Sequence, residues 1–279
     1  MKKEFLLMAA LCLYLSGFAQ TDTTGKSNPS SDTIKIGTMI IIKQGNPETG
    51  DRTEIYIPKH HHHDSYRPSN VSTNWLIVDL GFANYNDRTN YSSAEAQAFA
   101  PGSTDDWFSL KYGKSVDVNI WAFMQRLNVI KHVINLKYGL GIELNNYRYS
   151  ENVKYLTSPT KVIMTHDSAA YSKNKLAADY VTVPLMVNFN FTPHRRHEFG
   201  LSAGVSAGYL YSSRQKTINS IDGKQKTHDS FDLNPWKISW IAELQFGPVK
   251  LYGSYATQSM FKKGLDQVPY TFGIRLSNW

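Results

Sequence analysis

The sequence predicts an all-β protein: an eight-stranded antiparallel up-and-down transmembrane β-barrel, preceded by a short periplasmic N-terminal segment. Three observations support this fold class. Apolar and polar residues alternate along eight stretches of residues 74–279, as in strands whose two faces meet different surroundings. The connections between these stretches are alternately long and short. Charged residues make up 19% of the chain and aromatic residues 13%, whereas a soluble domain carries about 25% charge.

Residues 1–19 have the features of a secretory signal peptide. Lys2 and Lys3 precede an apolar run over residues 5–18, which is followed by the small residue Ala19. The run is shorter than the roughly 20 residues that a membrane-spanning helix needs. We therefore expect cleavage after Ala19.

The only cysteine, Cys12, lies within that apolar run. One alternative makes Cys12 the lipid-bearing residue of a lipoprotein, but Leu11 stands where a small residue is expected. After cleavage the mature chain has no cysteine, which excludes disulfide bonds and thiol catalysis.

Residues 20–73 are expected to form the periplasmic segment. Residues 33–43 and 52–57 each alternate isoleucine with polar residues, and turn-forming glycine, asparagine and proline lie between them. This pattern predicts a β-hairpin over residues 33–57. A lone hairpin is only marginally stable in water, so we expect it to contact the barrel rim or a partner protein.

Residues 59–67 form a basic, histidine-rich tether between that hairpin and the barrel. Its four consecutive imidazoles are weak candidates for metal ligands: His60, His61, His62 and His63. The sequence has no second ligand cluster at zinc-finger spacing, which leaves a closed structural metal site without support. The favoured interpretation is a hydrated tether beside anionic headgroups, and no cofactor is expected.

Each of the eight stretches over residues 74–279 separates an apolar face from a polar face. In the third stretch, Leu136 and Leu140 share one face, whereas Glu143 lies on the other. The stretches cover residues 76–83, 116–125, 133–145, 181–191, 199–209, 236–246, 249–255 and 270–277. The long connections are 86–114, 150–177, 212–235 and 260–267, and the short ones lie near 131–132, 192–197 and 247–248. Outer-membrane barrels have this alternation of short periplasmic turns and longer external loops.

The polar face holds four acidic and four basic residues, as expected of a compact interior with paired charges. This predicted interior charge network comprises Asp79, Asp117, Lys137, Glu143, Lys237, Glu243, Lys250 and Arg275. The apolar face has no charge over the centre of each stretch, as lipid contact requires. The alternative is a soluble barrel of the lipocalin kind, whose apolar face points inward around a ligand. The charged polar face favours the membrane barrel.

Aromatic residues near the ends of the stretches are expected at the membrane–water interfaces, where amphipathic rings are favoured. They are Trp75, Tyr85, Tyr147, Tyr149, Tyr209, Tyr211, Trp236 and Trp279. Bulky residues on the polar face predict a plugged lumen without a wide pore, because eight strands enclose a space that side chains can fill. The bulky residues are Trp121, Phe123, Tyr180, Met186, Ile241 and Tyr252.

Motifs for chemistry are weak. His166 and Ser168, with an aspartate between them, suggest a catalytic triad, but adjacent side chains rarely point at one another and the fold assembles triads. No phosphate-cradling loop and no nucleic-acid-binding pattern occurs in the sequence. The formal net charge of +7, with many lysines in the long connections, favours contact with anionic outer-membrane lipid and lipopolysaccharide.

Three segments resemble the PorT-like outer-membrane β-barrel family of Gram-negative bacteria. They are Y-V-T-V-P-L over residues 180–185, N-W-L-I-V-D-L-G-F over residues 74–82 and F-G-I-R-L over residues 272–276. The resemblance covers roughly residues 75–279. It implies an eight-stranded barrel that the barrel-assembly machinery inserts, and it implies no catalytic residue.

The carboxyl end departs from the usual insertion signal of such barrels. Trp279 is aromatic as expected, but it falls off the alternation of Ile274 and Leu276. Recognition by the assembly machinery is therefore expected to rest on residues 272–276.

These observations lead to an expected residence in the bacterial outer membrane and to an expected non-enzymatic structural or surface-interaction role in the envelope. One alternative is an accessory subunit of a secretion or assembly complex, as some PorT-like members are, which docks a periplasmic protein partner through its N-terminal segment. A second, less favoured alternative is an outer-membrane lipid-modifying enzyme that uses His166 or Ser168.

Overall fold

The structure is a computed structural model, and it describes residues 32–36, 39–44, 52–56, 68–165, 171–193, 195 and 198–277. The chain divides into two compact units, Met1–His63 and Asp64–Trp279.

The first unit contains a small antiparallel sheet. Its strands, in spatial order, are β1 (Asp32–Ile36), β2 (Met39–Gln44) and β3 (Arg52–Tyr56). The hairpin predicted over residues 33–57 is therefore corrected to three strands, because the stretch predicted as one strand over residues 33–43 forms two. Gly37 separates the two strands in the sequence, and glycine favours turns because it adopts backbone conformations that other residues avoid.

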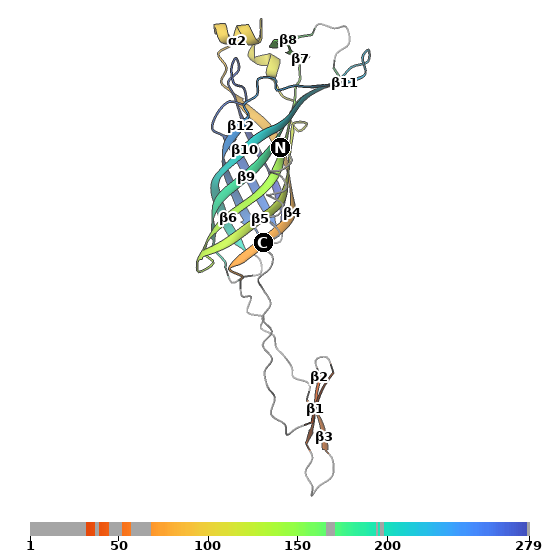
Figure 1. Ribbon diagram of the computed structural model, residues 1–279, viewed down its shortest axis with the longest axis vertical. Coiled ribbons are helices and arrows are strands. Elements are labelled where there is room, and N and C mark those ends of the chain that lie inside the picture. Colours follow the sequence, from red (N-terminus) through yellow and green to blue (C-terminus); the bar gives the residue numbers. More distant parts are fainter. Residues whose placement is uncertain are drawn as a thin grey trace, which may run out of the picture. The chain divides into compact units, whose positions relative to one another are not determined.

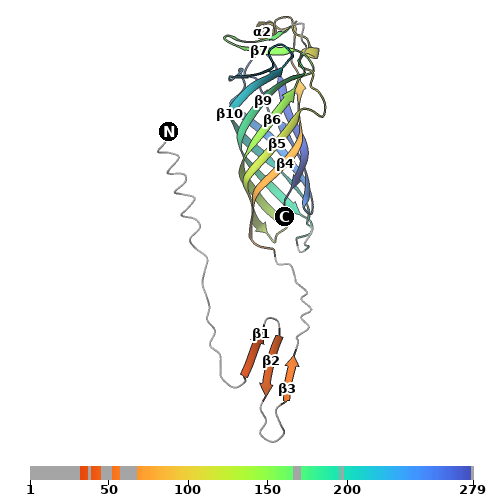
Figure 2. The same ribbon diagram turned by 90° about the vertical axis from the view of Figure 1, so that its right-hand side faces the viewer.

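The second unit is built on one antiparallel sheet of nine strands. Eight of them pair in the order β4, β5, β6, β9, β10, β12, β13 and β14, and β14 pairs again with β4, so the pairings form a closed ring. Figure 1 and Figure 2 show this ring as a cylinder of tilted strands. The ring strands are β4 (Val71–Asp87), β5 (Val116–Ile130), β6 (Ile134–Arg148), β9 (Lys173–Asn190), β10 (Phe199–Ile218), β12 (Trp236–Phe246), β13 (Val249–Ala256) and β14 (Gln267–Leu276).

The connections of the ring alternate in length as predicted. The long ones meet at one end, the loop end, and carry α2 (Ala94–Phe99), the 3-10 helix η1 (Asp105–Phe108), the hairpin of β7 (Val153–Thr157) and β8 (Thr160–Met164), and β11 (Lys224–His228). The short ones meet at the opposite end, the turn end, where β14 also finishes (Figure 1). No helix among the described residues is long and apolar enough to cross a membrane.

Two strands extend farther at the loop end than the alternation predicted. β9 begins at Lys173 and β10 continues to Ile218, inside the long connections predicted at residues 150–177 and 212–235. The far half of β10 pairs with β9 on one side and with β11 on the other. In these extensions charged and polar side chains replace the outward apolar ones. The apolar alternation therefore stops before the backbone pairing does, and the predicted strands were too short.

The ring faces outward with apolar side chains and inward with polar ones. On β9, Val181, Val183 and Leu185 are exposed on the outside, whereas Thr182 and Tyr180 are buried inside. Successive side chains of a strand point to opposite faces, so this alternation is kept along the strand. Exposed apolar residues of the other ring strands repeat the pattern, which is the inside-out polarity that the sequence predicted.

A bulge on β5 reverses the predicted alternation. The pairing register with β6 shifts between Trp121 and Phe123, which leaves Ala122 as an extra residue. Beyond it, Met124 is fully buried, and the Phe123 ring lies outside against exposed Trp75, with ring centroids 5.9 Å apart. The prediction that Phe123 fills the lumen was therefore wrong, because one extra residue exchanges the two faces of a strand.

Pro184 coincides with a gap in the pairing of β6 with β9. The pairs Tyr138–Leu185 and Gly141–Thr182 are formed, whereas Gly139 and Pro184, which would lie opposite each other between them, are not paired. Proline has no backbone N–H to donate, which explains the interruption. The pairing of Pro184 with the opposite neighbour, β10, is kept.

Candidate functional site

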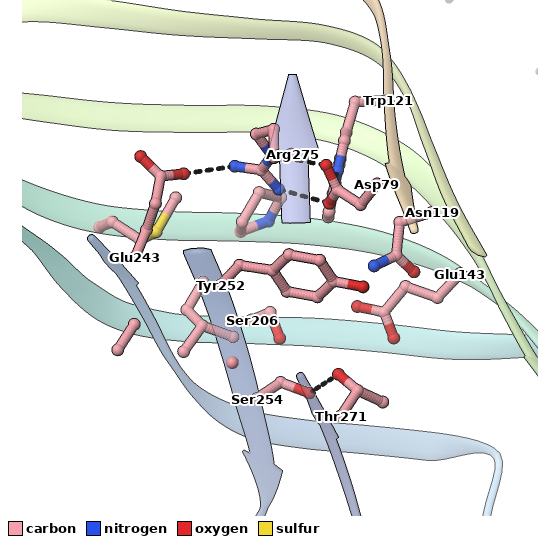
Figure 3. Close-up of a pocket in the computed structure, with 15 residues that line it drawn as sticks. Asp79, Asn119, Trp121, Glu143, Ser206, Glu243, Tyr252, Ser254, Thr271 and Arg275 are labelled. Atoms are coloured by element: carbon pink, nitrogen blue, oxygen red, sulfur yellow. Dashed lines mark hydrogen bonds and ion pairs between the residues drawn. The ribbon is translucent and has the colours of Figure 1, made fainter. Parts of the chain in front are cut away.

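Arg275 on β14 lies at the centre of the ring interior. Its guanidinium donates to both carboxylate oxygens of Asp79 on β4, from Nε to Oδ1 at 2.6 Å and from Nη2 to Oδ2 at 2.7 Å. Its Nη1 donates to Glu243 Oε2 at 2.6 Å (Figure 3). Trp121 Nε1 also donates to Asp79 Oδ2, at 2.7 Å, and Lys137 Nζ donates to Glu243. One network thereby joins β4, β5, β6, β12 and β14.

A second group of polar contacts lies closer to the loop end. Lys237 Nζ donates to Glu143 Oε2 at 2.8 Å, which links β12 with β6 across the interior. The Tyr252 hydroxyl donates to Asp117 Oδ2, and Asn119 Nδ2 donates to the same oxygen at 2.9 Å. The carboxylate of Asp117 is therefore held by donors on two strands, β5 and β13.

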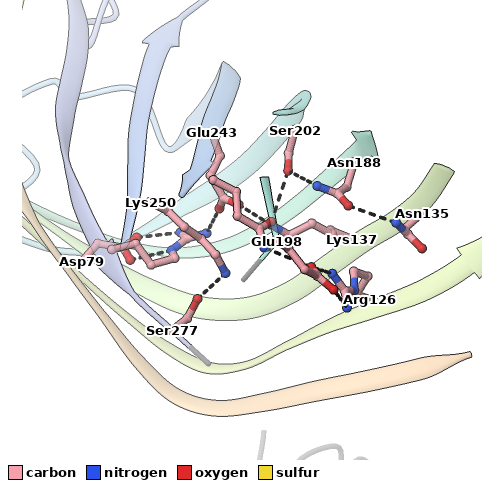
Figure 4. Close-up of polar contacts among 12 residues, drawn as sticks. Asp79, Arg126, Asn135, Lys137, Asn188, Glu198, Ser202, Glu243, Lys250 and Ser277 are labelled. Carbon is pink, nitrogen blue, oxygen red and sulfur yellow. Dashed lines mark hydrogen bonds and ion pairs between the residues drawn. The ribbon is translucent and has the colours of Figure 1, made fainter. Parts of the chain in front are cut away.

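A third group lies near the turn end. Arg126 forms a two-point ion pair with Glu198, and Gln245 Nε2 donates to Glu198 Oε2 at 3.1 Å (Figure 4). Lys250 Nζ donates to the hydroxyl of Ser277. These contacts fix the short connection before β10 to the interior of the ring.

All eight residues of the predicted charge network lie in this interior, and each is at most 7% exposed. Together with Arg126 and Glu198, these residues form a buried set of five acidic and five basic side chains. Burying an unpaired charge costs several kcal/mol, so a balanced and hydrogen-bonded set is the arrangement that a closed interior tolerates.

Arg126 and Glu198 are the interior charges that the sequence pattern missed. Arg126 lies one residue beyond the predicted stretch 116–125, where continued alternation would place it on the outer face, and the bulge at Ala122 turns it inward. A lipid-facing arginine is costly, so an arginine at such a position is a sequence signal for a change in register. Glu198 lies in a short connection, where alternation carries no information.

A small cavity lies between some of these groups. A cavity of about 30 Å³ lies among Asp79, Trp121 and Tyr252 (Figure 3), enough for about one water molecule. An apolar layer, formed by Ile77, Trp121, Met124 and Met186 with Ile241 against it, crosses the interior. These residues place large side chains within the described interior.

The loop end is covered by a second apolar cluster, the aromatic cap. Its buried aromatic members come from ring strands, α2, η1, β7 and the long connections: Tyr85, Phe99, Phe108, Tyr147, Tyr149, Tyr155, Tyr180, Phe231 and Phe261. The hydroxyls of Tyr149 and Tyr155 lie 2.7 Å apart, and the Tyr155 ring stacks on the Phe261 ring at 6.2 Å. Burial raises the pKa of Tyr155 well above its ordinary value, so this phenol stays protonated. The cap is a small hydrophobic core built above the ring.

The cap corrects the expectation for three tyrosines. Tyr85, Tyr147 and Tyr149 were expected at a membrane–water interface, but each is buried in the aromatic cap. They lie on the inward face of their strands, and the long connections fold over them. The exposed end aromatics are Trp75, Tyr209, Tyr211 and Trp236, and Trp279 lies outside the described residues.

The candidates for metal binding and catalysis lie outside the described residues. They are the histidine tract of residues 60–63, and His166 and Ser168. Within the described ranges, no group of three or more His, Cys, Asp or Glu side chains could hold a metal ion.

Comparison with models of protein families gives a match to the ring. Residues 78–257 match the model of a family described as outer membrane protein beta-barrel domain. The match begins on β4 and ends after β13, so it covers most of the ring. No curated protein matches the chain.

Proposed function

The chain belongs to the outer membrane protein β-barrel domain family and resides in the bacterial outer membrane, and from this premise we propose that it is a non-enzymatic integral protein with a plugged lumen. In this proposal the ring is an eight-stranded transmembrane barrel, the loop end faces outward from the cell and the turn end faces the periplasm. Its role is to support the envelope or to present a surface there.

The filled interior carries this proposal. Buried ion pairs and an apolar layer lie within the ring, and a cavity of about 30 Å³ lies among Asp79, Trp121 and Tyr252. A conducting channel needs a continuous aqueous path, whereas an eight-stranded barrel encloses only enough space for side chains. The aromatic cap adds a second barrier at the loop end.

Conductance measurement tests the plugged lumen. The folded protein, reconstituted in a planar bilayer, is expected to show no steady nanosiemens steps. A large general porin in the same bilayer serves as the positive control, and heat-dependent gel migration verifies that the chain is folded. Steady steps of nanosiemens size from the folded protein would overturn the proposal.

A second candidate function is an accessory role in a secretion or assembly complex. The observation that favours it is the separate first unit, whose three-stranded sheet presents backbone edges that a partner can pair with. Crosslinking in intact envelopes, with and without residues 20–67, tests it. A periplasmic partner that is recovered only with the full chain supports this function, and identical sets of crosslinked proteins exclude it.

We also propose that the chain is a PorT-like member of its family. Pro184, within the resembling segment, faces inward on β9 at the gap in its pairing with β6, which gives that segment a structural role. Phe272, Ile274 and Leu276 are exposed on the outside of β14, where the barrel-assembly machinery can reach them during insertion.

A further inference from the structure

Four basic residues stand opposite one another on four neighbouring strands at the loop end. Arg148 on β6 is paired with Lys175 on β9, and Lys175 is paired with Lys216 on β10. Lys216 is in turn paired with Lys226 on β11. Because neighbouring strands lie about 4.8 Å apart, this cation row, Arg148, Lys175, Lys216 and Lys226, crosses roughly 14 Å of sheet.

The cation row faces outward, on the same side as the apolar exterior of the ring. On β9, Lys175 has the same parity as the exposed Val181 and Val183. The adjacent Asn174 points inward, where its amide donates to Val153 O at 2.7 Å. On β10, Gln215, adjacent to Lys216, also points inward and donates to Val153 O. The basic side chains therefore continue the outer face of the ring beyond its apolar part.

Further cations surround the row, and acidic partners are scarce. Lys173 and Lys224 flank it on β9 and β11, two residues from Lys175 and Lys226. Asp179 is the acidic residue on this part of β9, and it is engaged by Arg214. Within the described part of the chain, no ion pair joins a residue of the row to a carboxylate.

This arrangement is unfavourable for the protein alone. Like charges directly opposite each other destabilise a pair of strands. The pKa of Lys175 is lowered to about 8, first by partial burial and then by the charges of Lys173, Arg214 and Lys216. An anion placed against the row would remove the repulsion, because it would neutralise several of these charges together.

The position of the row indicates which anion this is. Exposed Tyr209 and Trp236, with ring centroids 5.0 Å apart, lie where the apolar exterior ends, a place that amphipathic rings favour. Lys216 lies five residues beyond exposed Tyr211 on β10, about 16 Å along the strand and less along the membrane normal because barrel strands tilt. The row is therefore at the height of the phosphate groups of the outer leaflet.

We propose that the cation row binds the phosphate groups of the phosphorylated glycolipid in the outer leaflet, with β6, β9, β10 and β11 forming one side of the lipid's binding surface. The inference rests on the proposed function, because the orientation of the barrel places the row at this leaflet. Surface charges attract anionic headgroups over a distance of about a Debye length, and a row on one rigid sheet presents them together.

Binding of diphosphoryl lipid A to the full chain in zwitterionic micelles tests the proposal. The variant K175Q/K216Q is expected to bind at least tenfold more weakly than the wild type. The control variant K154Q/K161Q loses the same charge from the β7–β8 hairpin, outside the row, and is expected to stay within twofold. The variant K175R/K216R keeps the charge and is expected to retain affinity, which separates loss of charge from damage to the fold.

Three results would overturn the proposal. The first is that K175Q/K216Q binds lipid A as tightly as the wild type does, and the second is that the wild type binds lipid A without its two phosphates as tightly as diphosphoryl lipid A. The third is that the wild type binds inorganic phosphate, or an acidic polymer such as heparin, as tightly as diphosphoryl lipid A. Heat-dependent gel migration and the conductance measurement on the same samples distinguish this failure from failure of the proposed function. If the folded barrel does not conduct and does not bind lipid A, only the lipid-binding site is excluded. If the barrel conducts but still binds lipid A, only the plugged lumen is excluded.

Discussion

Arg275 and Asp79, separated by 196 residues, form a two-point ion pair that joins the last strand of the ring to the first. Arg275 Nη1 also reaches Glu243, so one guanidinium neutralises two buried carboxylates. The contact lies where β14 pairs with β4, and the buried charge of each partner is compensated across the two strands.

Replacement of this arginine is expected to be strongly destabilising. R275Q removes a positive charge that neutralises the buried carboxylates of Asp79 and Glu243. By analogy with other buried ion pairs, the free energy of unfolding is expected to fall by about 3–5 kcal/mol. Urea titration of the folded protein in micelles, followed by heat-dependent gel migration, measures the change. The matched control is R88Q, because Arg88 pairs with Asp266 at the exposed loop end, and its loss is expected to cost less than about 1 kcal/mol. Equal effects of R275Q and R88Q would contradict the role assigned to the network.

The aromatic cap is expected to depend on Gly264. This residue has φ +83°, and a Cβ there would lie 2.4 Å from Phe99 Cβ. G264A therefore strains the backbone and displaces Phe99, whereas G113A, at φ +72° with nothing within 4 Å of the added Cβ, strains only the backbone. Cleavage of the cap by a protease is expected to be on the order of tenfold faster in G264A than in G113A, because local opening becomes easier. Equal cleavage rates would show that the packing of Phe99 does not hold the cap closed.

The outward apolar face is tested by a lysine at Val183. This side chain is 49% exposed in the middle of β9, where V183K would place a charge against lipid at a cost of about 2–4 kcal/mol. Val133, exposed in the short connection between β5 and β6, provides the control, and V133K is expected to cost at most about 1 kcal/mol. Equilibrium unfolding in lipid bilayers measures both. If V183K were tolerated as well as V133K, this face of β9 would not contact lipid.

The titration of Lys175 is expected to respond to lipid. The pKa of Lys175 is lowered to about 8, below the ordinary 10.5, so between these values the unfolded chain binds more protons than the folded one and stability rises with pH. K175Q is expected to remove this part of the rise, and bound lipid phosphate is expected to return the pKa of Lys175 toward 10.5. NMR of isotope-labelled lysine measures the pKa directly. The charged groups that face this lysine are Lys173 and Asp179 on β9, Arg214 and Lys216 on β10, and Arg148 on β6.

The polarity of the ring could be predicted from the sequence because it is a local property with a period of two residues. Leu136 and Lys137 fall on opposite faces in the sequence and in the structure, and the same rule places Glu243 and Arg275 inside. The alternating lengths of the connections could also be predicted from the sequence. The length of each connection depends only on where one alternating stretch ends and the next begins.

The differences arise where the structure depends on distant residues. Ala122 carries no signal of its own, and its bulge is defined only by the pairing of β5 with β6. Tyr85 and Tyr149 look like interface residues in the sequence, and the long connections that cover them are unrelated to them in sequence. Lys175 and Lys216 were predicted in loops. Their charged segments lack the apolar alternation of a strand, and the strand that pairs with each lies about 40 positions away in the sequence.

The short strand β11 gives the molecule one sheet edge at the loop end that, among the described residues, pairs on one side only. A bare edge of this kind is a template for association with another copy. Here Lys224, Lys226 and His228 line that edge, and two such edges brought together would repel each other. This repulsion disfavours edge-to-edge association of neighbouring copies, and under the proposal above the same lysines would be available to glycolipid phosphates.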